Sequence, residues 1–153
     1  MNAPTCGVFA FGGGPLVGDR LVRVIYVDET GHDARQRRCV VAGVIIDPDR
    51  QWRTLSDSIE ALKENVPPEF RPGFIFHATD LFNGGKYRGC WEAQERWSLL
   101  ESLVALPRKL FIPLVFGFVT KPKQRDKPRI ESIIVHVMAY GACLQAADWF
   151  MLT

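Results

Sequence analysis

Residues 22–46 read VRVIYVDETGHDARQRRCVVAGVII, and this stretch decides the fold. Its first part, Val22–Val27, is rich in β-branched residues and predicts a strand. The next residues, Asp28–Gly31, are typical of a turn. Cys39–Ile46 is a nearly continuous apolar run, as in a strand that is buried on both faces. The two strands can pair as a hairpin, so the stretch predicts the beginning of a sheet.

Helical and strand-like patterns follow this hairpin and predict an α/β fold. The expected elements are a helix from about Pro48 to Pro67, a short strand at 74–76, a helix at 91–105, a strand at 110–119 and a helix at 130–152. Pro107 is expected to stop the second helix. Pro113 lies inside the later strand and indicates an edge position or a bulge.

The last predicted helix, Ile130–Leu152, is apolar nearly all round, so it must be buried. The sequence nevertheless stops at Thr153 with no glycine cap and no basic last turn. We therefore expect either a chain truncated at its C-terminus or a second chain that covers this helix, as in a homo-oligomer. Its uncharged run, Ser132–Ala147, is shorter than the roughly 20 residues of a spanning helix, which argues against a membrane segment.

The chain has 153 residues, which suits one domain with its own core. Apolar residues make up 47% and charged residues 24%, which excludes a disordered chain. The formal charge of +2 is too small to indicate nucleic-acid binding by itself. The four cysteines have no zinc-ligand spacing and form no disulfide framework, which favours the cytoplasm. We expect a flexible leader at 1–20 and a single domain at 21–153.

Asp28 and Glu29 end the first strand, at the rim of a sheet where side chains can reach a ligand. Adjacent residues of a strand point to opposite faces, so Asp28 is the better candidate and Glu29 turns outward or stabilises the turn. The simpler alternative, which spacing alone favours, is that both acids are ordinary turn residues.

A second candidate group is the segment HATD, which contains His77 and Asp80. Imidazole and carboxylate together suit a divalent metal or acid–base chemistry. If a helix begins at Thr79, then Thr79 or Asp80 is an N-cap instead, and spacing alone favours this simpler role.

Two further sets of polar residues need an explanation. The last helix carries His136, Tyr140, Gln145 and Asp148. We expect structural hydrogen bonds in the core for His136 and Tyr140, and solvent contact for Asp148. The loop before that helix has alternating basic residues at Lys121, Lys123, Arg125, Lys127 and Arg129. These residues could bind phosphates, as could Arg35, Arg37 and Arg38, but a solvated basic loop is the more frequent arrangement.

Three segments together resemble the family called domain of unknown function 3800. They are YVDETG at 26–31 followed by VVAGVII at 40–46, FHATDL at 76–81, and HVMAY at 136–140 continuing through Cys143 to DWFM at 148–151. The resemblance spans roughly residues 22–152 and implies a ribonuclease H-like fold, with a mixed sheet flanked by helices.

The resemblance also implies a nuclease or other phosphodiester hydrolase that depends on Mg²⁺ or Mn²⁺. Asp28 matches the first-strand acid that binds the metal, and Asp80 is carried over as a second metal ligand. Glu29 would be a supporting acid, and His77 a ligand or proton shuttle. Carboxylates hold such cations, which orient water and stabilise the charge that develops on phosphate.

The sequence departs from the family pattern in two places. Ile75 stands where the family usually carries a glutamate, and isoleucine cannot bind a metal. The family also continues past the long helix into a further strand with an acid. Three functions therefore stay open: a metal-dependent nuclease, a non-catalytic module of the same fold that binds nucleic acid or protein, and a self-associating fragment.

Overall fold

The computed structural model describes residues 5–11, 22–31, 36–121 and 129–152, with side chains at 22–31, 36–121 and 133–152. The chain divides into two compact units. The sheet unit comprises Met1–Asp47 and Phe111–Thr153, and the helical unit comprises Pro48–Leu110. Residues 48–110, which were expected to share a single domain at 21–153 with the sheet, pack around an apolar cluster of their own.

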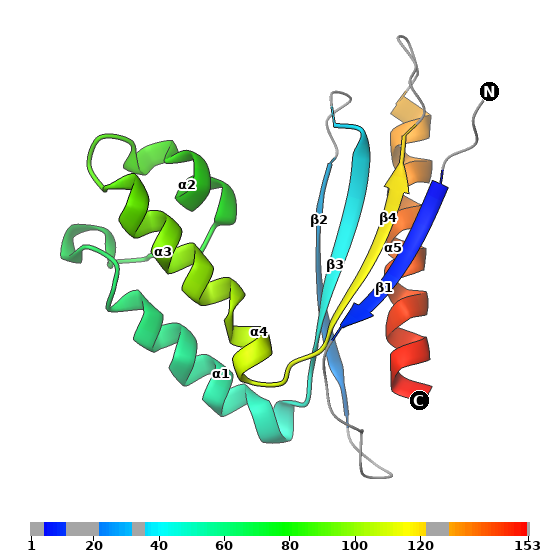
Figure 1. Ribbon diagram of the computed structural model, residues 1–153, viewed down its shortest axis with the longest axis horizontal. Coiled ribbons are helices and arrows are strands. Elements are labelled where there is room, and N and C mark those ends of the chain that lie inside the picture. The colour runs from blue at the N-terminus through cyan, green and yellow to red at the C-terminus, as the bar shows by residue number, and fades with distance from the viewer. Residues whose placement is uncertain (1–4, 12–21, 32–35, 122–128, 153) are drawn as a thin grey trace. The chain divides into compact units, whose positions relative to one another are not determined.

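The sheet unit contains four described strands and one helix, which confirms the α/β class (Figure 1). The strands are β1 (Thr5–Phe11), β2 (Val24–Thr30), β3 (Arg38–Ile46) and β4 (Leu114–Thr120), arranged in the order β1-β4-β3-β2. Every described pairing is antiparallel. The expected mixed sheet is therefore not seen among the described strands.

Strand β1 lies in the segment that was expected to be a flexible leader. It pairs with β4, with Phe9 opposite Phe116, because its run of apolar residues suits a strand as well as that of β4 does. Strand β4 therefore lies between β1 and β3, and the expectation of an edge position was wrong. Pro113 precedes β4, where it needs no N–H donor, and its carbonyl accepts a hydrogen bond from the Ile45 N–H at 3.0 Å.

The predicted hairpin of β2 and β3 is confirmed, with Val27 opposite Gly43. Strand β2 is longer than expected, because Asp28, Glu29 and Thr30 continue the ladder. The turn interpretation of the two acids was therefore wrong. The bend begins at Gly31, whose φ is 94°, and a Cβ at this position would collide with the backbone of Arg38.

Helix α5 (Arg129–Leu152) packs against one face of the sheet, over β4, β1 and β3 (Figure 1). The buried cluster joins Cys39, Val41, Ile45, Val115 and Val119 of the sheet to Val135, Ala139, Cys143, Ala146 and Ala147 of α5. The helix approaches the sheet so closely that a Cβ on Gly117 would meet the carbonyl oxygen of Ala139 and the backbone nitrogen of Cys143.

Within one copy α5 is buried on its inner side only, and its outer side is exposed. The segment Ile133–Leu152 has 20 residues and is long and apolar enough to cross a membrane by length and composition, with a third of it buried. This segment is longer than the uncharged run Ser132–Ala147 because it includes Asp148 and the residues after it. The core helix of a soluble protein can have the same length and composition.

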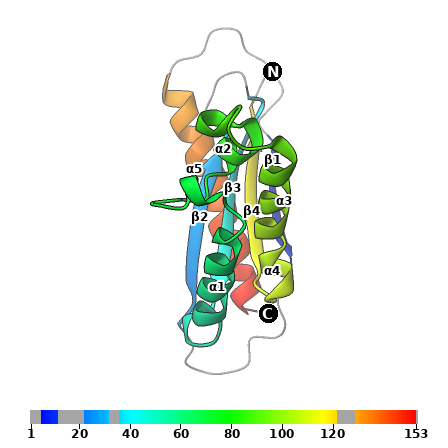
Figure 2. The ribbon, with the colours of Figure 1, turned by 90° about the vertical axis from the view of Figure 1, so that its left-hand side faces the viewer.

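The helical unit consists of α1 (Pro48–Lys63), α2 (Ala78–Asn83), α3 (Ala93–Val104) and α4 (Leu106–Lys109), and Figure 2 shows it from a second side. Two short 3-10 turns lie at Pro68–Phe70 and Gly85–Tyr87. Pro107 does not end the helical region, because it occupies the first turn of α4, where a proline is tolerated.

An aromatic cluster forms the core of the helical unit. It contains Val66, Phe74, Leu81, Tyr87, Trp91 and Leu99. Residues 74–76 do not form the expected strand. Phe74 instead packs edge-on against Phe76, with ring centroids 5.0 Å apart.

Candidate functional site

The strand register separates the two acids of β2. Glu29 lies opposite Val41, which is fully buried beneath α5, and Asp28 lies opposite Ala42 on the other face of the sheet. The Asp28 side chain is exposed, and its Oδ1 accepts a hydrogen bond from the Glu29 N–H at 2.9 Å. Asp28 and Glu29 therefore cannot serve one site from the same side of the sheet.

A pocket of about 570 Å³ lies at the end of the β2–β3 hairpin. Its lining combines two arginines, two threonines and three other residues: Thr30, Gly31, Gln36, Arg37, Arg38, Val40 and Thr120. The ammonium of Lys121 donates a hydrogen bond to the Gly31 carbonyl oxygen at 2.5 Å, and the Lys121 N–H donates one to the Arg37 carbonyl oxygen at 2.8 Å. These bonds fasten β4 to both arms of the hairpin.

The pocket and Asp28 share one face of the sheet. Thr30 lies opposite Val40, Arg38 lies opposite Thr120, and both pairs alternate with the residues that face α5. Asp28 is two residues from Thr30 along β2, which corresponds to about 7 Å in a strand. The face thus offers guanidinium groups and hydroxyls, with one carboxylate beside them.

This arrangement suits an anionic group with several oxygens. Arginine presents a planar set of N–H donors that match phosphate, and threonine hydroxyls add shorter-range donors. Arg37 and Arg38 were among the residues expected to bind phosphate. Thr30 and Thr120 were missed, because only the strand register shows that they join the same pocket.

The described residues do not form a complete metal site. They contain no group of three or more His, Cys, Asp or Glu side chains that could hold an ion. Mg²⁺ usually needs one or two carboxylates together with phosphate and water oxygens. Asp28 supplies one carboxylate on its face, and Glu29 points to the other face. The set of ligands implied by the family resemblance is therefore not assembled in the sheet unit.

His77 and Asp80 belong to the helical unit. His77 precedes α2 as its N-cap residue, and its Nδ1 lies 3.3 Å from Oδ2 of Asp80. The helix begins at Ala78, so the proposed N-cap roles of Thr79 and Asp80 were wrong. The His77 side chain is 65% exposed, and its ring faces the Asp80 carboxylate.

The polar residues of α5 lie mostly outside the core. Tyr140, Gln145 and Asp148 are exposed, and the ring of His136 stacks on that of Tyr140 with centroids 6.5 Å apart. The expected core role of Tyr140 was therefore wrong, because the residue lies on the outer side of the helix. Three of the four basic residues assigned to nucleic-acid binding, Lys123, Arg125 and Lys127, lie outside the described residues.

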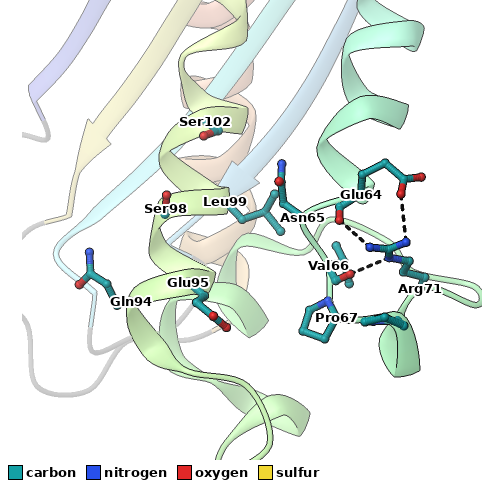
Figure 3. Close-up of a pocket in the computed structure, with 11 residues that line it drawn as sticks. Glu64, Asn65, Val66, Pro67, Arg71, Gln94, Glu95, Ser98, Leu99 and Ser102 are labelled. Atoms are coloured by element: carbon teal, nitrogen blue, oxygen red, sulfur yellow. Dashed lines mark hydrogen bonds and ion pairs between the residues drawn. The ribbon is translucent and has the colours of Figure 1, made fainter.

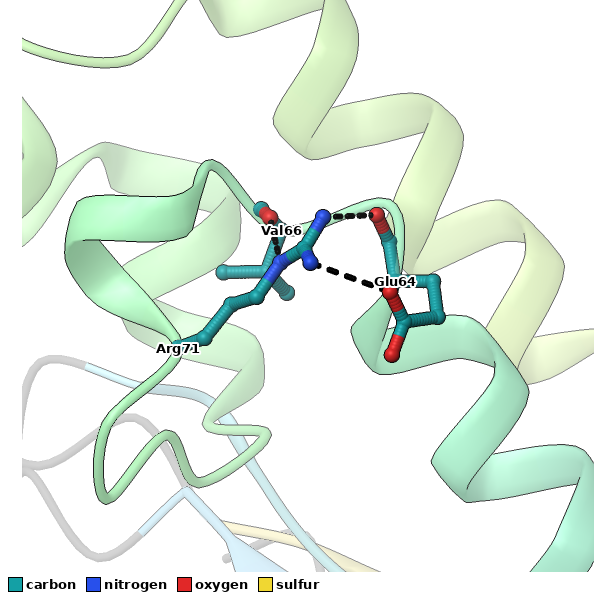
Figure 4. Close-up of polar contacts among 3 residues, drawn as sticks. All are labelled: Glu64, Val66 and Arg71. Carbon is teal, nitrogen blue, oxygen red and sulfur yellow. Dashed lines mark hydrogen bonds and ion pairs between the residues drawn. The ribbon is translucent and has the colours of Figure 1, made fainter.

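A cleft of about 710 Å³ lies in the helical unit, between the segment after α1 and the outer side of α3 (Figure 3). Arg71 fixes one wall of it by donating to the carbonyl oxygens of Glu64 and Val66, at 2.6 and 2.7 Å, and to the Glu64 carboxylate at 3.0 Å (Figure 4). These bonds satisfy carbonyls that follow the end of α1. The guanidinium is occupied in this way, so its role in the cleft is structural.

Two cysteines of the sheet unit are protected from reaction. Burial raises the pKa of the Cys39 thiol, and the Lys121 charge only partly opposes this shift. Burial also raises the pKa of the Cys143 thiol, although an interaction with the Gly117 backbone opposes it. Because the thiolate is the reactive form, neither residue is suited to nucleophilic chemistry or metal binding.

Comparisons of the chain with protein-family models, with curated proteins and with solved structures found no match.

Proposed function

We propose that the hairpin end of the sheet unit binds the phosphate groups of a nucleic acid without catalysis. The observation that carries this proposal is the pocket lined by Arg37 and Arg38 together with Thr30 and Thr120. Lys121, the first of the four residues assigned to nucleic-acid binding, joins the same end of the sheet through Gly31. The backbone carries a phosphate at every nucleotide, so several basic residues along one edge can act together.

The test is the binding of a fluorescent single-stranded oligonucleotide to the full chain at several salt concentrations. We expect the double variant Arg37→Ala/Arg38→Ala to bind at least about tenfold more weakly, because two phosphate contacts are lost. The slope of log K against log salt should become shallower by about 1.4. Each phosphate contact on a single strand contributes about 0.7 to this slope, and the double variant loses two. The matched control is Arg108→Ala/Lys109→Ala, which removes two adjacent exposed charges from α4. Equal losses in both double variants would show that binding is only a response to net charge.

A second candidate is hydrolysis of a phosphodiester with Mg²⁺ or Mn²⁺, in a ribonuclease H-like fold as the family resemblance implies. The observation that favours it is the place of Asp28, on the same face as the basic pocket and about two residues away along β2. A metal there would stabilise charge on the bound phosphate. The incomplete set of carboxylates makes this the weaker of the two proposals.

A nuclease assay with Mn²⁺ separates the two candidates. If the chain hydrolyses nucleic acid, Asp28→Asn should abolish a metal-dependent activity that Glu29→Gln retains, because Glu29 lies on the other face. If the chain only binds, no Mn²⁺-dependent cleavage is expected in any variant. Asp28→Asn should then bind the oligonucleotide a few times more tightly, because a negative charge beside the phosphate is removed.

A further inference from the structure

The outer side of α5 is an apolar surface that no described part of the sheet unit covers. Nine large apolar side chains of this helix are exposed: Ile133, Ile134, Val137, Met138, Tyr140, Leu144, Trp149, Met151 and Leu152. We propose that two copies of this chain pack these outer sides together, with the helices antiparallel across a twofold axis near Gly141.

Gly141 marks the centre of this surface. It lies at the middle of the 24 residues of α5. At 3.6 residues per turn, it also falls midway across the arc of exposed positions, between Tyr140 on one side and Trp149 on the other. A Cβ placed on Gly141 would have no atom within 4 Å. Glycine weakens a helix interior, and none of the described residues of the sheet unit requires one at this position.

Gly117, in the same unit, is a position where close packing requires glycine. A Cβ there would meet backbone atoms of Ala139 and Cys143, because α5 lies directly against the strand. A glycine of β4 thus allows the inner side of α5 to lie directly against that strand. Gly141 offers the same close approach on the outer side, to a partner that is another helix backbone.

The size of the surface suits a dimer. The nine exposed side chains range from 38% to 77% exposed. With roughly 200 Å² for a large apolar side chain, they present on the order of 1,000 Å², and a standard interface buries about 800 Å² on each partner. An apolar patch of this size is rare on a protein that stays monomeric.

A second copy matches the chemistry of this surface better than a lipid bilayer. The inner residues Ala139, Cys143 and Ala146 are fully buried against the sheet, so α5 cannot be surrounded by lipid without leaving it. Leaving the sheet would expose Val41, Val115 and Val119, which are fully buried beneath α5, to water. The described outer side carries one charge, Asp148, so it offers no charge pattern that would select a different protein.

In the antiparallel arrangement, different residues of the two copies of α5 face each other. A twofold axis at Gly141 places Val137 opposite Gln145 of the partner subunit, and Ile133 opposite the partner's Trp149. Asp148 lies seven residues from the axis, about 10 Å along the helix, and so close to the end of the contact at Ile133 and Trp149. Its carboxylate can therefore stay hydrated at the rim while the apolar centre closes.

Sedimentation of the full chain from about 1 to about 100 µM tests this proposal. We expect a reversible dimer. Val137→Lys should raise the dimer dissociation constant about tenfold or more, since Val137 is 61% exposed and close to the axis. Val104→Lys is the matched control, because Val104 is 67% exposed on α3 in the other unit, and it should leave the constant unchanged.

Gly141→Leu provides a second variant that should not unfold the monomer. Its side chain has open space in one copy and prefers a helix, but it blocks the close approach of two helices. Loss of the dimer with an unchanged or higher melting temperature supports the proposal. A wild type that is monomeric throughout the concentration range, or a dimer that tolerates both Val137→Lys and Gly141→Leu, overturns it. So does a monomer that binds vesicles of phosphatidylcholine, which would assign the surface to lipid.

Discussion

The two units of the chain bury their apolar residues in different ways. The sheet unit uses small and β-branched side chains, such as Val41, Val115 and Ala139, each fully buried between one helix and one sheet. The helical unit uses large rings, such as Phe74, Tyr87 and Trp91, which contact each other at centroid distances of 5.3 to 6.2 Å. The first core depends on close backbone approach, and the second depends on large side chains that fill the space between short helices.

The difference also appears in how the two units satisfy polar groups. The sheet unit has ladders of backbone hydrogen bonds along whole strands. The short helices of the other unit rely on side chains. Arg96 is buried in that unit, and its guanidinium donates to the carbonyl oxygens of Leu81 and Trp91, at 2.6 and 3.1 Å. Trp97 likewise donates to the Phe82 carbonyl oxygen at 3.1 Å. These bonds hold α3 against the end of α2.

The largest effect is expected at Gly117, where the sheet unit has no room for a side chain. Gly117→Ala should destabilise this unit by about 4 kcal/mol or more, because the new Cβ meets the rigid backbone of α5. Gly43→Ala is the matched control on the adjacent strand. Its Cβ would meet side-chain atoms of Val115 and Ile25 rather than backbone, so the cost should be smaller, about 1–3 kcal/mol. Chemical denaturation with amide hydrogen exchange of peptides from each unit measures both. Similar losses for the two variants would contradict the role given to α5.

A smaller effect is expected from the polar contacts of the helical unit. Arg96→Met keeps the apolar stem but leaves the Leu81 and Trp91 carbonyls without their donors, so it should cost about 2–3 kcal/mol. Faster amide exchange should be confined to residues 48–110. The exposed Arg108 on α4 is the control, and Arg108→Met should change stability by less than about 0.5 kcal/mol. Accelerated exchange in the sheet unit as well would mean that the two units do not unfold separately.

The parts of the fold that sequence predicted are those in which one pattern persists over many residues. The hairpin of β2 and β3 and the long helix α5 follow from β-branched runs and from sustained apolar character. Strand β1 was missed, since its pairing with β4 depends on a partner more than 100 positions away in the sequence. The aromatic residues at 74–76 resembled a strand because a short apolar run does not distinguish a strand from a segment that fills a core.

The candidate site was predicted only in part for a similar reason. Strand alternation alone separated Asp28 from Glu29, and the register agrees with that separation. The role of Thr30 and Thr120 could not be derived from sequence, since they are 90 positions apart and meet only through β3. The outer side of α5 was expected to be buried because the whole helix is apolar. Composition does not show which side of a helix the same chain covers, and here the outer side is exposed.

The smallest effect is expected at Gly141. Substitution there shows whether alanine destabilises position 117 because of the contact with α5 or because any glycine in this unit resists substitution. Both glycines lack a side chain, but a Cβ at Gly141 has open space within one copy. Gly141→Ala should therefore stabilise the monomer by about 0.5–1 kcal/mol, since alanine prefers the helix interior. The measurement is denaturation at concentrations where the chain is monomeric, beside Gly117→Ala. A loss of stability in Gly117→Ala together with a gain in Gly141→Ala would show that, within the sheet unit, only the inner side of α5 is packed. A loss of stability at both would mean that the outer side is also packed within a single copy.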